Sequence, residues 1–218
     1  MRTLNELLSG ESALPMIKAL ITQAENHIEV LEGSTQAGSE TLQRLQITTS
    51  SPMGAIAHHT GGLLLEDGWI RIIGHGHARL PQQLHTWTQQ LDWPQPTPKL
   101  LVIAYDVLGG LFVLGGAALP GKPGDVFYFA PDTLEFEPLE VGYTGFLSWS
   151  MTKEGVADFY QDHRWPSWRD DTKSLAPNHI FSFYPFMFSQ EFDPQTATRR
   201  AIPTQEAVNL LLNLSNAL

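Results

Sequence analysis

The stretch from Leu100 to Trp149 constrains the fold most, because short apolar runs alternate in it with residues that favour tight turns. The apolar runs are 100–104, 111–114 and 126–129, and residues 134–137 follow as a strand in which apolar and acidic residues alternate. Successive short strands joined by tight turns are typical of an antiparallel meander. Aromatic and apolar residues from Tyr143 to Ser150 then recur at helical spacing, so we expect a helix packed against the sheet.

The segments on either side predict further helices and one hairpin. Apolar residues spaced by three and four predict an amphipathic helix over 14–31, which Gly33 would end. Ser51 and Pro52 are a helix start signal, and this helix would end before Gly61-Gly62. Asp67-Gly68 between two apolar runs predicts a hairpin over 63–73.

The end of the chain predicts a last helix that begins at Pro203 or Thr204. We found no internal repeat and no clear linker. We therefore expect a single α+β domain over residues 1–218, with a helical N-terminal extension (1–50) and a core (51–218). A chain of 218 residues can bury about 70% of its unfolded surface, which is enough to fold without disulfides or metals.

Composition excludes several classes of function. The chain is acidic, with a net charge of -10 and 13 scattered basic residues, which argues against nucleic acid as a partner. It contains no cysteine, which removes thiol catalysis and thiolate zinc sites. The start of the chain lacks an apolar signal core, and no apolar run reaches 18 residues, so we expect a cytoplasmic protein without membrane association.

The histidines are the first candidates for chemistry. His75 and His77 are two residues apart, which on a strand would place both on one face, and His58-His59 could join them at a metal. No third ligand follows at a recognisable spacing, and the flanking glycines are more typical of a flexible surface loop. We therefore predict no metal and no other cofactor.

Other catalytic patterns are weak. No Gly-x-Ser-x-Gly nucleophile elbow is present, and the paired glycines are not followed by a helix that could cradle phosphate. Glu135 and Glu137 would share one face of a strand, where a charged edge explains them more simply than a catalytic carboxylate pair. Asp106 and Asp132 begin turns, where their carboxylates would accept backbone hydrogen bonds.

One group of residues is the best candidate for a binding site. Trp87 and Trp93 lie just before a proline-rich connection and suit a binding surface better than the other tryptophans do. The candidate binding residues are His75, His77, Arg79, Trp87 and Asp106.

Two sequence blocks resemble a bacterial protein family of unknown function. They are Phe-Ala-Pro-Asp-Thr-Leu-Glu (129–135) and Arg-Trp-Pro-Ser-Trp (164–168), and the resemblance extends from about Gly62 to Pro203. Phe136 stands where the family usually has a tryptophan.

The order of elements also resembles, more distantly, the SUKH superfamily, which includes bacterial immunity proteins and the Smi/Knr group. There, helices precede a glycine-containing turn, an antiparallel sheet and a helix with an aromatic start. This resemblance implies a protein-binding scaffold that neutralises a toxin, and it brings no catalytic residues.

Two functions follow as hypotheses. The first is a non-enzymatic binding module whose acidic surface attracts a basic partner such as a toxin. The alternative is a hydrolase or small-molecule binder that uses the region of His75, His77, Arg79 and Asp106. The many aromatic residues would also suit a homodimer interface.

Overall fold

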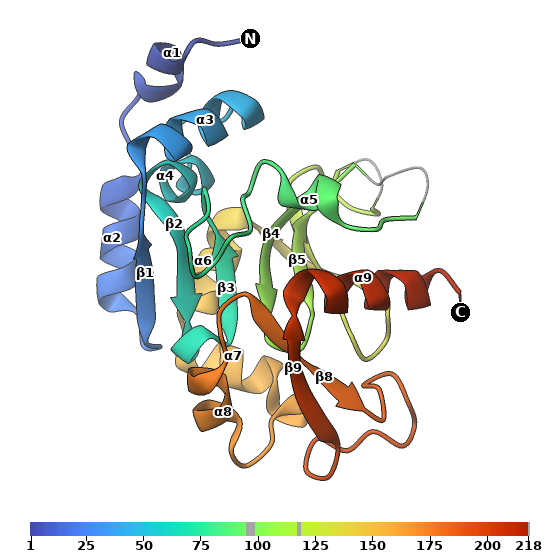
Figure 1. The fold of residues 1–218 in the computed structure, drawn as a ribbon. Helices are drawn as coiled ribbons and strands as arrows, with labels where there is room; N and C mark the ends of the chain where they lie inside the picture. The colour runs from blue at the N-terminus through green and yellow to red at the C-terminus, as the bar shows by residue number, and fades with distance from the viewer. Residues whose placement is uncertain (95–98, 117–118, 218) are drawn as a thin grey trace.

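The computed structural model describes residues 1–94, 99–116 and 119–217. Within these ranges, seven strands form one antiparallel sheet, in which each strand pairs with its neighbour in the chain (Figure 1). The strands are β1 (Ile28–Glu32), β2 (Thr60–Leu65), β3 (Ile70–Ile73), β4 (Leu101–Asp106), β5 (Leu111–Leu114), β6 (Asp125–Phe129) and β7 (Phe136–Gly142). The predicted α+β class and the antiparallel meander are confirmed.

The helices precede, cover and follow this sheet. They are α1 (Leu4–Leu8), α2 (Leu14–Gln23), α3 (Thr35–Leu45), α4 (Pro52–His59), α5 (Trp87–Gln90), α6 (Tyr143–Ser150), α7 (Lys153–Phe159), α8 (Trp168–Ser174) and α9 (Thr204–Ser215), with the short 3-10 turns η1 (Glu66–Gly68) and η2 (Gln161–His163). The helices predicted over 52–59, from Tyr143 and from residue 204 are confirmed.

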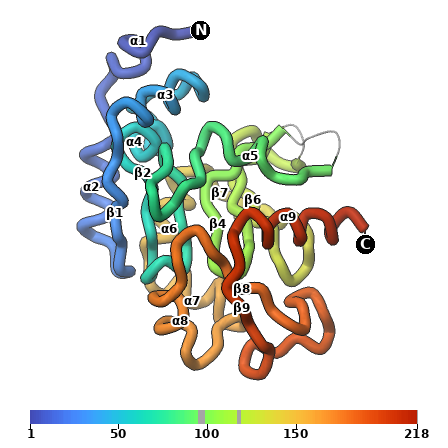
Figure 2. Tube along the Cα trace, viewed as in Figure 1, coloured from blue at the N-terminus to red at the C-terminus, as the bar shows by residue number. Residues whose placement is uncertain are grey.

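Two layers enclose the sheet. Helices α6 and α7 lie behind it in Figure 1. Phe112 of β5 packs against Phe146 of α6 and Phe159 of α7. In front lie α9 and a second antiparallel sheet of β8 (His179–Tyr184) and β9 (Thr198–Pro203), as the tube in Figure 2 also shows. Because the central strands are covered on both faces, every residue of β2 and β3 is buried.

The helix predicted over 14–31 is wrong in its second half. Helix α2 ends at Gln23, and residues 28–32 form edge strand β1, which pairs with β2. Between them, the backbone N–H groups of Glu25 and Asn26 donate to the carbonyl of Met151 at the end of α6. These hydrogen bonds, together with pairing to the edge of β2, favour a strand at 28–32 although the local spacing of apolar residues favours a helix.

The second sheet was not predicted either. The aromatic segment from Phe181 to Tyr184 lies in β8, and its partner β9 follows a long connection that carries no two-residue hairpin signal. The backbone N–H of Phe181 donates to the carbonyl of Val107, so the two sheets are joined directly. In the sequence, Pro81 followed by Leu84, Trp87 and Leu91 predicts a short helix from residue 81, but only the four residues of α5 are helical.

A buried carboxylate, that of Asp106, lies where β4, β6 and α7 meet. Its Oδ1 accepts hydrogen bonds from the backbone N–H groups of Leu108 and Gly110, both at 2.9 Å. Its Oδ2 accepts from the hydroxyls of Tyr128 at 2.7 Å and Tyr160 at 2.9 Å. Burial raises the pKa of Asp106, and the four donors act against that rise. The predicted turn role of Asp106 is confirmed, and the two tyrosines extend it to the core.

Removal of a single tyrosine hydroxyl tests this network. We expect Tyr128→Phe to lower the free energy of unfolding by about 1.5–3 kcal/mol, because it removes a hydrogen bond to a buried carboxyl group. Tyr143→Phe is the matched control, since the Tyr143 hydroxyl is buried without a partner among the described residues. Tyr143→Phe should leave the free energy of unfolding unchanged or raise it slightly. Urea denaturation of both variants measures the difference, and equal losses would contradict the prediction.

Candidate functional site

The predicted binding residues do not come together in the structure. In the register of β3 with β4, Asp106 lies opposite Ile70, whereas His75 follows the other end of β3. His75 is five residues from Ile70, and five residues of extended chain span about 16 Å. His75 and Asp106 therefore belong to opposite ends of the sheet.

His75 is a buried structural side chain, although a flexible surface loop was expected there. Its ring is 2% exposed, its Nε2 accepts from the backbone N–H of Ser34 at 2.8 Å, and its Nδ1 lies 2.9 Å from the carbonyl oxygen of Ala57. These partners require a neutral imidazole with the proton on Nδ1. Burial also lowers the pKa of His75. Within the described ranges, no three His, Asp or Glu side chains are grouped so that they could hold a metal ion.

The residues that follow His75 reach the molecular surface. His77 is half-buried, and its Nδ1 accepts from the backbone N–H of Arg79 at 3.1 Å. Arg79 is exposed and forms an ion pair with Glu29 of β1, in which the second contact joins Nη2 to Oε2 at 3.2 Å.

The tryptophans predicted to form a binding surface are in the core. Trp87 is 2% exposed, its ring centroid lies 5.0 Å from that of Tyr105, and its Nε1 donates to Gln205 of α9 at 2.8 Å. Trp93 is also buried, and its Nε1 donates to the carbonyl of Thr88. The prediction of an exposed surface was therefore wrong for both.

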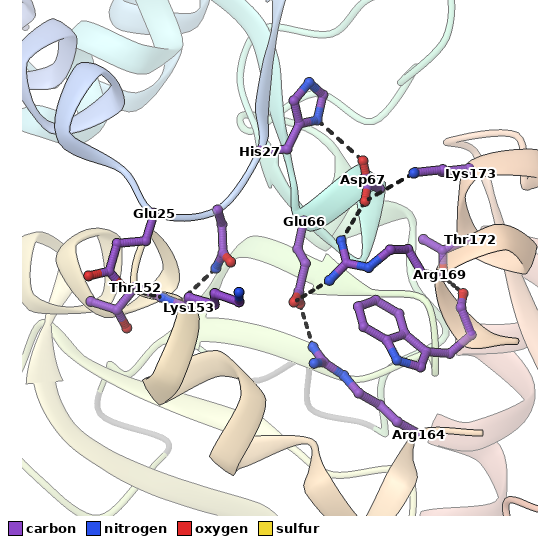
Figure 3. A network of polar contacts seen from close by, with 12 residues as sticks. Glu25, His27, Glu66, Asp67, Thr152, Lys153, Arg164, Arg169, Thr172 and Lys173 are labelled. Carbon is purple, nitrogen blue, oxygen red and sulfur yellow. Dashed lines mark hydrogen bonds and ion pairs between the residues drawn. The ribbon is translucent and has the colours of Figure 1, made fainter. Parts of the chain in front are cut away.

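A charged network lies at the turn between β2 and β3 (Figure 3). Figure 3 shows Glu66 between Arg164 and Arg169. Its Oε1 lies 3.7 Å from Nη2 of Arg169. The adjacent Asp67 accepts from Arg169 at 2.7 Å and lies 3.9 Å from Nζ of Lys173. The network joins this hairpin turn to α8, which is far away in the sequence.

The backbone of this turn is unusual. Glu66 and Asp67 have φ values of 50° and 61°, in the left-handed region that residues other than glycine rarely adopt. Burial raises the pKa of Glu66, and the guanidinium groups of Arg164 and Arg169 oppose that rise. The ion pairs thus compensate a carboxylate that is almost fully buried.

Aromatic rings surround the guanidinium group of Arg164. It lies 4.0 Å from the ring centroid of Trp168, 5.0 Å from that of Trp69 and 5.8 Å from that of Tyr160. Arginine stacked on aromatic rings gains a cation–π attraction in addition to its ion pair. The Arg-Trp-Pro-Ser-Trp block therefore binds the hairpin that carries Glu66 and Trp69.

A charged cleft adjoins this network. It has a cavity volume of about 260 Å³ and lies between β1, the β2–β3 hairpin and the end of α8. Its lining consists of His27, Glu29, Leu64, Asp67, Gly68, Arg71, Arg79, Thr172, Lys173, Leu175 and Pro177.

Lys173 and Arg71 are cationic lining residues that were not predicted from the sequence, and Arg71 is the buried one. It is 1% exposed, its Nε donates to the carbonyl of Gly68 at 3.0 Å, and Nη1 donates to the carbonyl of His179. Its guanidinium carbon lies 5.4 Å from the ring centroid of Tyr105. The available signal was an arginine in the middle of the apolar run Trp69–Ile73.

Comparison with known proteins assigns the chain to a family. The model of the family described as "Protein of unknown function DUF2625" matches residues 4–207. The chain belongs to this family. The predicted bacterial family of unknown function is confirmed, and the match begins well before Gly62.

Two bacterial relatives resemble the chain over most of its length. The Escherichia coli K12 protein "Putative uncharacterized protein YbfG" is 42% identical over 207 residues, which cover 94% of each chain. A Haemophilus influenzae protein named "Uncharacterized protein" is 38% identical over 188 residues, which cover 85% of this chain and 82% of the relative. In the part of the chain that the structure describes, no helix has the length and apolar character needed to cross a bilayer.

The two blocks that carried the family resemblance also lie close together in space. Asp132, from the first block, lies 3.1 Å from Nε2 of His163, which directly precedes the second. The hydrogen bond with Asp132 raises the pKa of His163, and the same bond lowers the pKa of Asp132. Both groups therefore favour the ionised pair.

This pair predicts a pH-dependent contribution to stability. A raised histidine pKa stabilises the fold fully below the ordinary value near 6.5 and loses its effect as the pH rises through the folded value. A lowered aspartate pKa stabilises fully above the ordinary value near 3.8. We expect His163→Gln to destabilise the protein most near pH 5 and less at pH 9. Urea unfolding at both values measures the difference, and an identical loss at both would contradict it.

Proposed function

We propose that the chain is a non-enzymatic protein-binding module of the immunity type, which neutralises a basic partner protein such as a toxin. The SUKH-like order of elements supports this proposal, as does the net charge of -10. A cytoplasmic location is part of the same proposal.

The observation that carries the proposal is the acidic edge of the main sheet. Strand β7 pairs only with β6 among the described strands, and Glu137 and Glu140 on it are exposed, together with Glu135 just before it. Pro138 and the positive φ of Glu140 interrupt the regular ladder, so this edge is poorly suited to the addition of another strand. A partner at this edge would be held by side-chain charge, which favours a basic protein.

The hydrolase alternative receives less support from its own residues. Both nitrogens of His75 and both oxygens of Asp106 are engaged in hydrogen bonds within the fold. A general acid or base needs a free position that faces the substrate. Of the residues named for this alternative, Arg79 lines the charged cleft.

Charge reversal at the edge tests the protein-binding proposal. We expect the wild-type chain, used as bait in extracts of its source cell, to recover one basic protein in stoichiometric amount. For the purified pair, Glu135→Lys, Glu137→Lys and Glu140→Lys together should weaken binding at least about tenfold, mainly through the association rate. The loss should shrink at high salt.

A second triple variant provides the control. Glu11→Lys, Glu32→Lys and Glu191→Lys change exposed side chains elsewhere and alter the net charge equally, so they should bind nearly as the wild type does. Recovery of no partner, or equal losses in both triple variants, would overturn the proposal. Light scattering of the bait alone shows whether the captured protein is instead a second copy of the chain.

A further inference from the structure

We infer that the charged cleft binds a small organic anion, whose carboxylate or phosphate group meets the guanidinium of Arg71 and the side chains of Arg79 and Lys173. This inference does not depend on a protein partner, because it rests on the charges and the shape of the cleft itself.

Among the described residues, Arg71 forms no ion pair with a carboxylate. Both of its hydrogen-bond partners, Gly68 and His179, are backbone carbonyls, which satisfy donors but carry no charge. Asp106 on the neighbouring strand attracts Arg71 at longer range, but its oxygens accept four hydrogen bonds from other groups and none from Arg71. A buried charge is costly unless it is paired, so an anion in the cleft would stabilise Arg71.

The rim of the cleft carries two more cations that can turn toward a ligand. The side chain of Arg79 is 49% exposed and that of Lys173 is 54% exposed. The lining of the cleft therefore holds three cationic side chains, those of Arg71, Arg79 and Lys173. It holds two carboxylates, Glu29 and Asp67, which are the ion-pair partners of Arg79 and Lys173. The cleft is therefore locally positive in a protein whose net charge is strongly negative. Such a local field favours an anion over a neutral ligand.

The walls of the cleft limit the size and type of the ligand. A cavity of about 260 Å³, just below the usual range for drug-sized ligands, suits a compact small molecule and is too small for a folded partner. Leu64, Leu175 and Pro177 supply an apolar wall beside the cations, which would accept a short carbon skeleton. The planar fork of an arginine matches the oxygens of carboxylate and phosphate groups.

Calorimetric titration and thermal unfolding with two probes test the inference. The probes are citrate and inorganic phosphate, each compared with sodium chloride at the same ionic strength. We expect at least one probe to bind and to raise the unfolding temperature, whereas chloride should not. The stronger probe shows whether the cleft prefers carboxylate or phosphate oxygens. A wild-type response to both probes no larger than that to chloride would overturn the inference.

Substitutions at the rim locate the binding. Lys173→Ala should weaken binding of the active probe about tenfold, because it removes one charge-assisted contact from a partly exposed side chain. Glu29→Gln should tighten binding, since it removes the carboxylate that competes for Arg79. Lys153→Ala is the matched control, because Lys153 is exposed and lies outside the cleft lining, and it should leave binding unchanged.

The buried arginine is tested last. Arg71→Met should abolish binding, but it also removes two hydrogen bonds that join β3 to the hairpin turn and to β8. The rim variants therefore decide the matter, since they alter exposed side chains. Unchanged affinity in Lys173→Ala, or equal losses in Lys173→Ala and Lys153→Ala, would overturn the assignment to this cleft.

Discussion

The hydrogen bonds of the buried Asp106 carboxylate are the interaction on which the rest of the fold depends. The carboxylate closes the β4–β5 turn through two backbone N–H groups, and it holds β6 and the end of α7 through two tyrosine hydroxyls. The turn leaves little room, because a Cβ on Gly110 would lie 2.1 Å from the Tyr128 hydroxyl oxygen. One side chain thus couples the central turn of the meander to the helical layer behind it.

A second set of polar contacts attaches α8 to the β2–β3 hairpin. Glu66 and Asp67 face Arg164, Arg169 and Lys173, and the rings around Arg164 exclude water from one side of the pair. The charged cleft borders this junction, because Asp67 and Lys173 belong to both. The strained hairpin turn therefore serves the attachment of α8 and also shapes the mouth of the cleft.

Much of the fold could be predicted from the sequence, and the site could not. Short-range signals were sufficient for the meander, the Asp67-Gly68 hairpin and the helix at Tyr143, since neighbouring strands in the chain are also neighbours in the sheet. Strand β1 was mistaken for helix, because the spacing of its apolar residues continues that of α2. His75 was read as a surface residue, because its flanking glycines resemble a loop.

The sequence by itself determined the α+β class, the order of the central strands and the turn role of Asp106. Each of these depends on residues close together in the chain, where periodicity and turn chemistry act directly. Only the tertiary structure decided that Arg71 lines a cleft, and that Arg164 pairs with Glu66. Both arrangements join segments about a hundred residues apart, and which side chains meet there is decided by the packing of α8 and β8 against the hairpin.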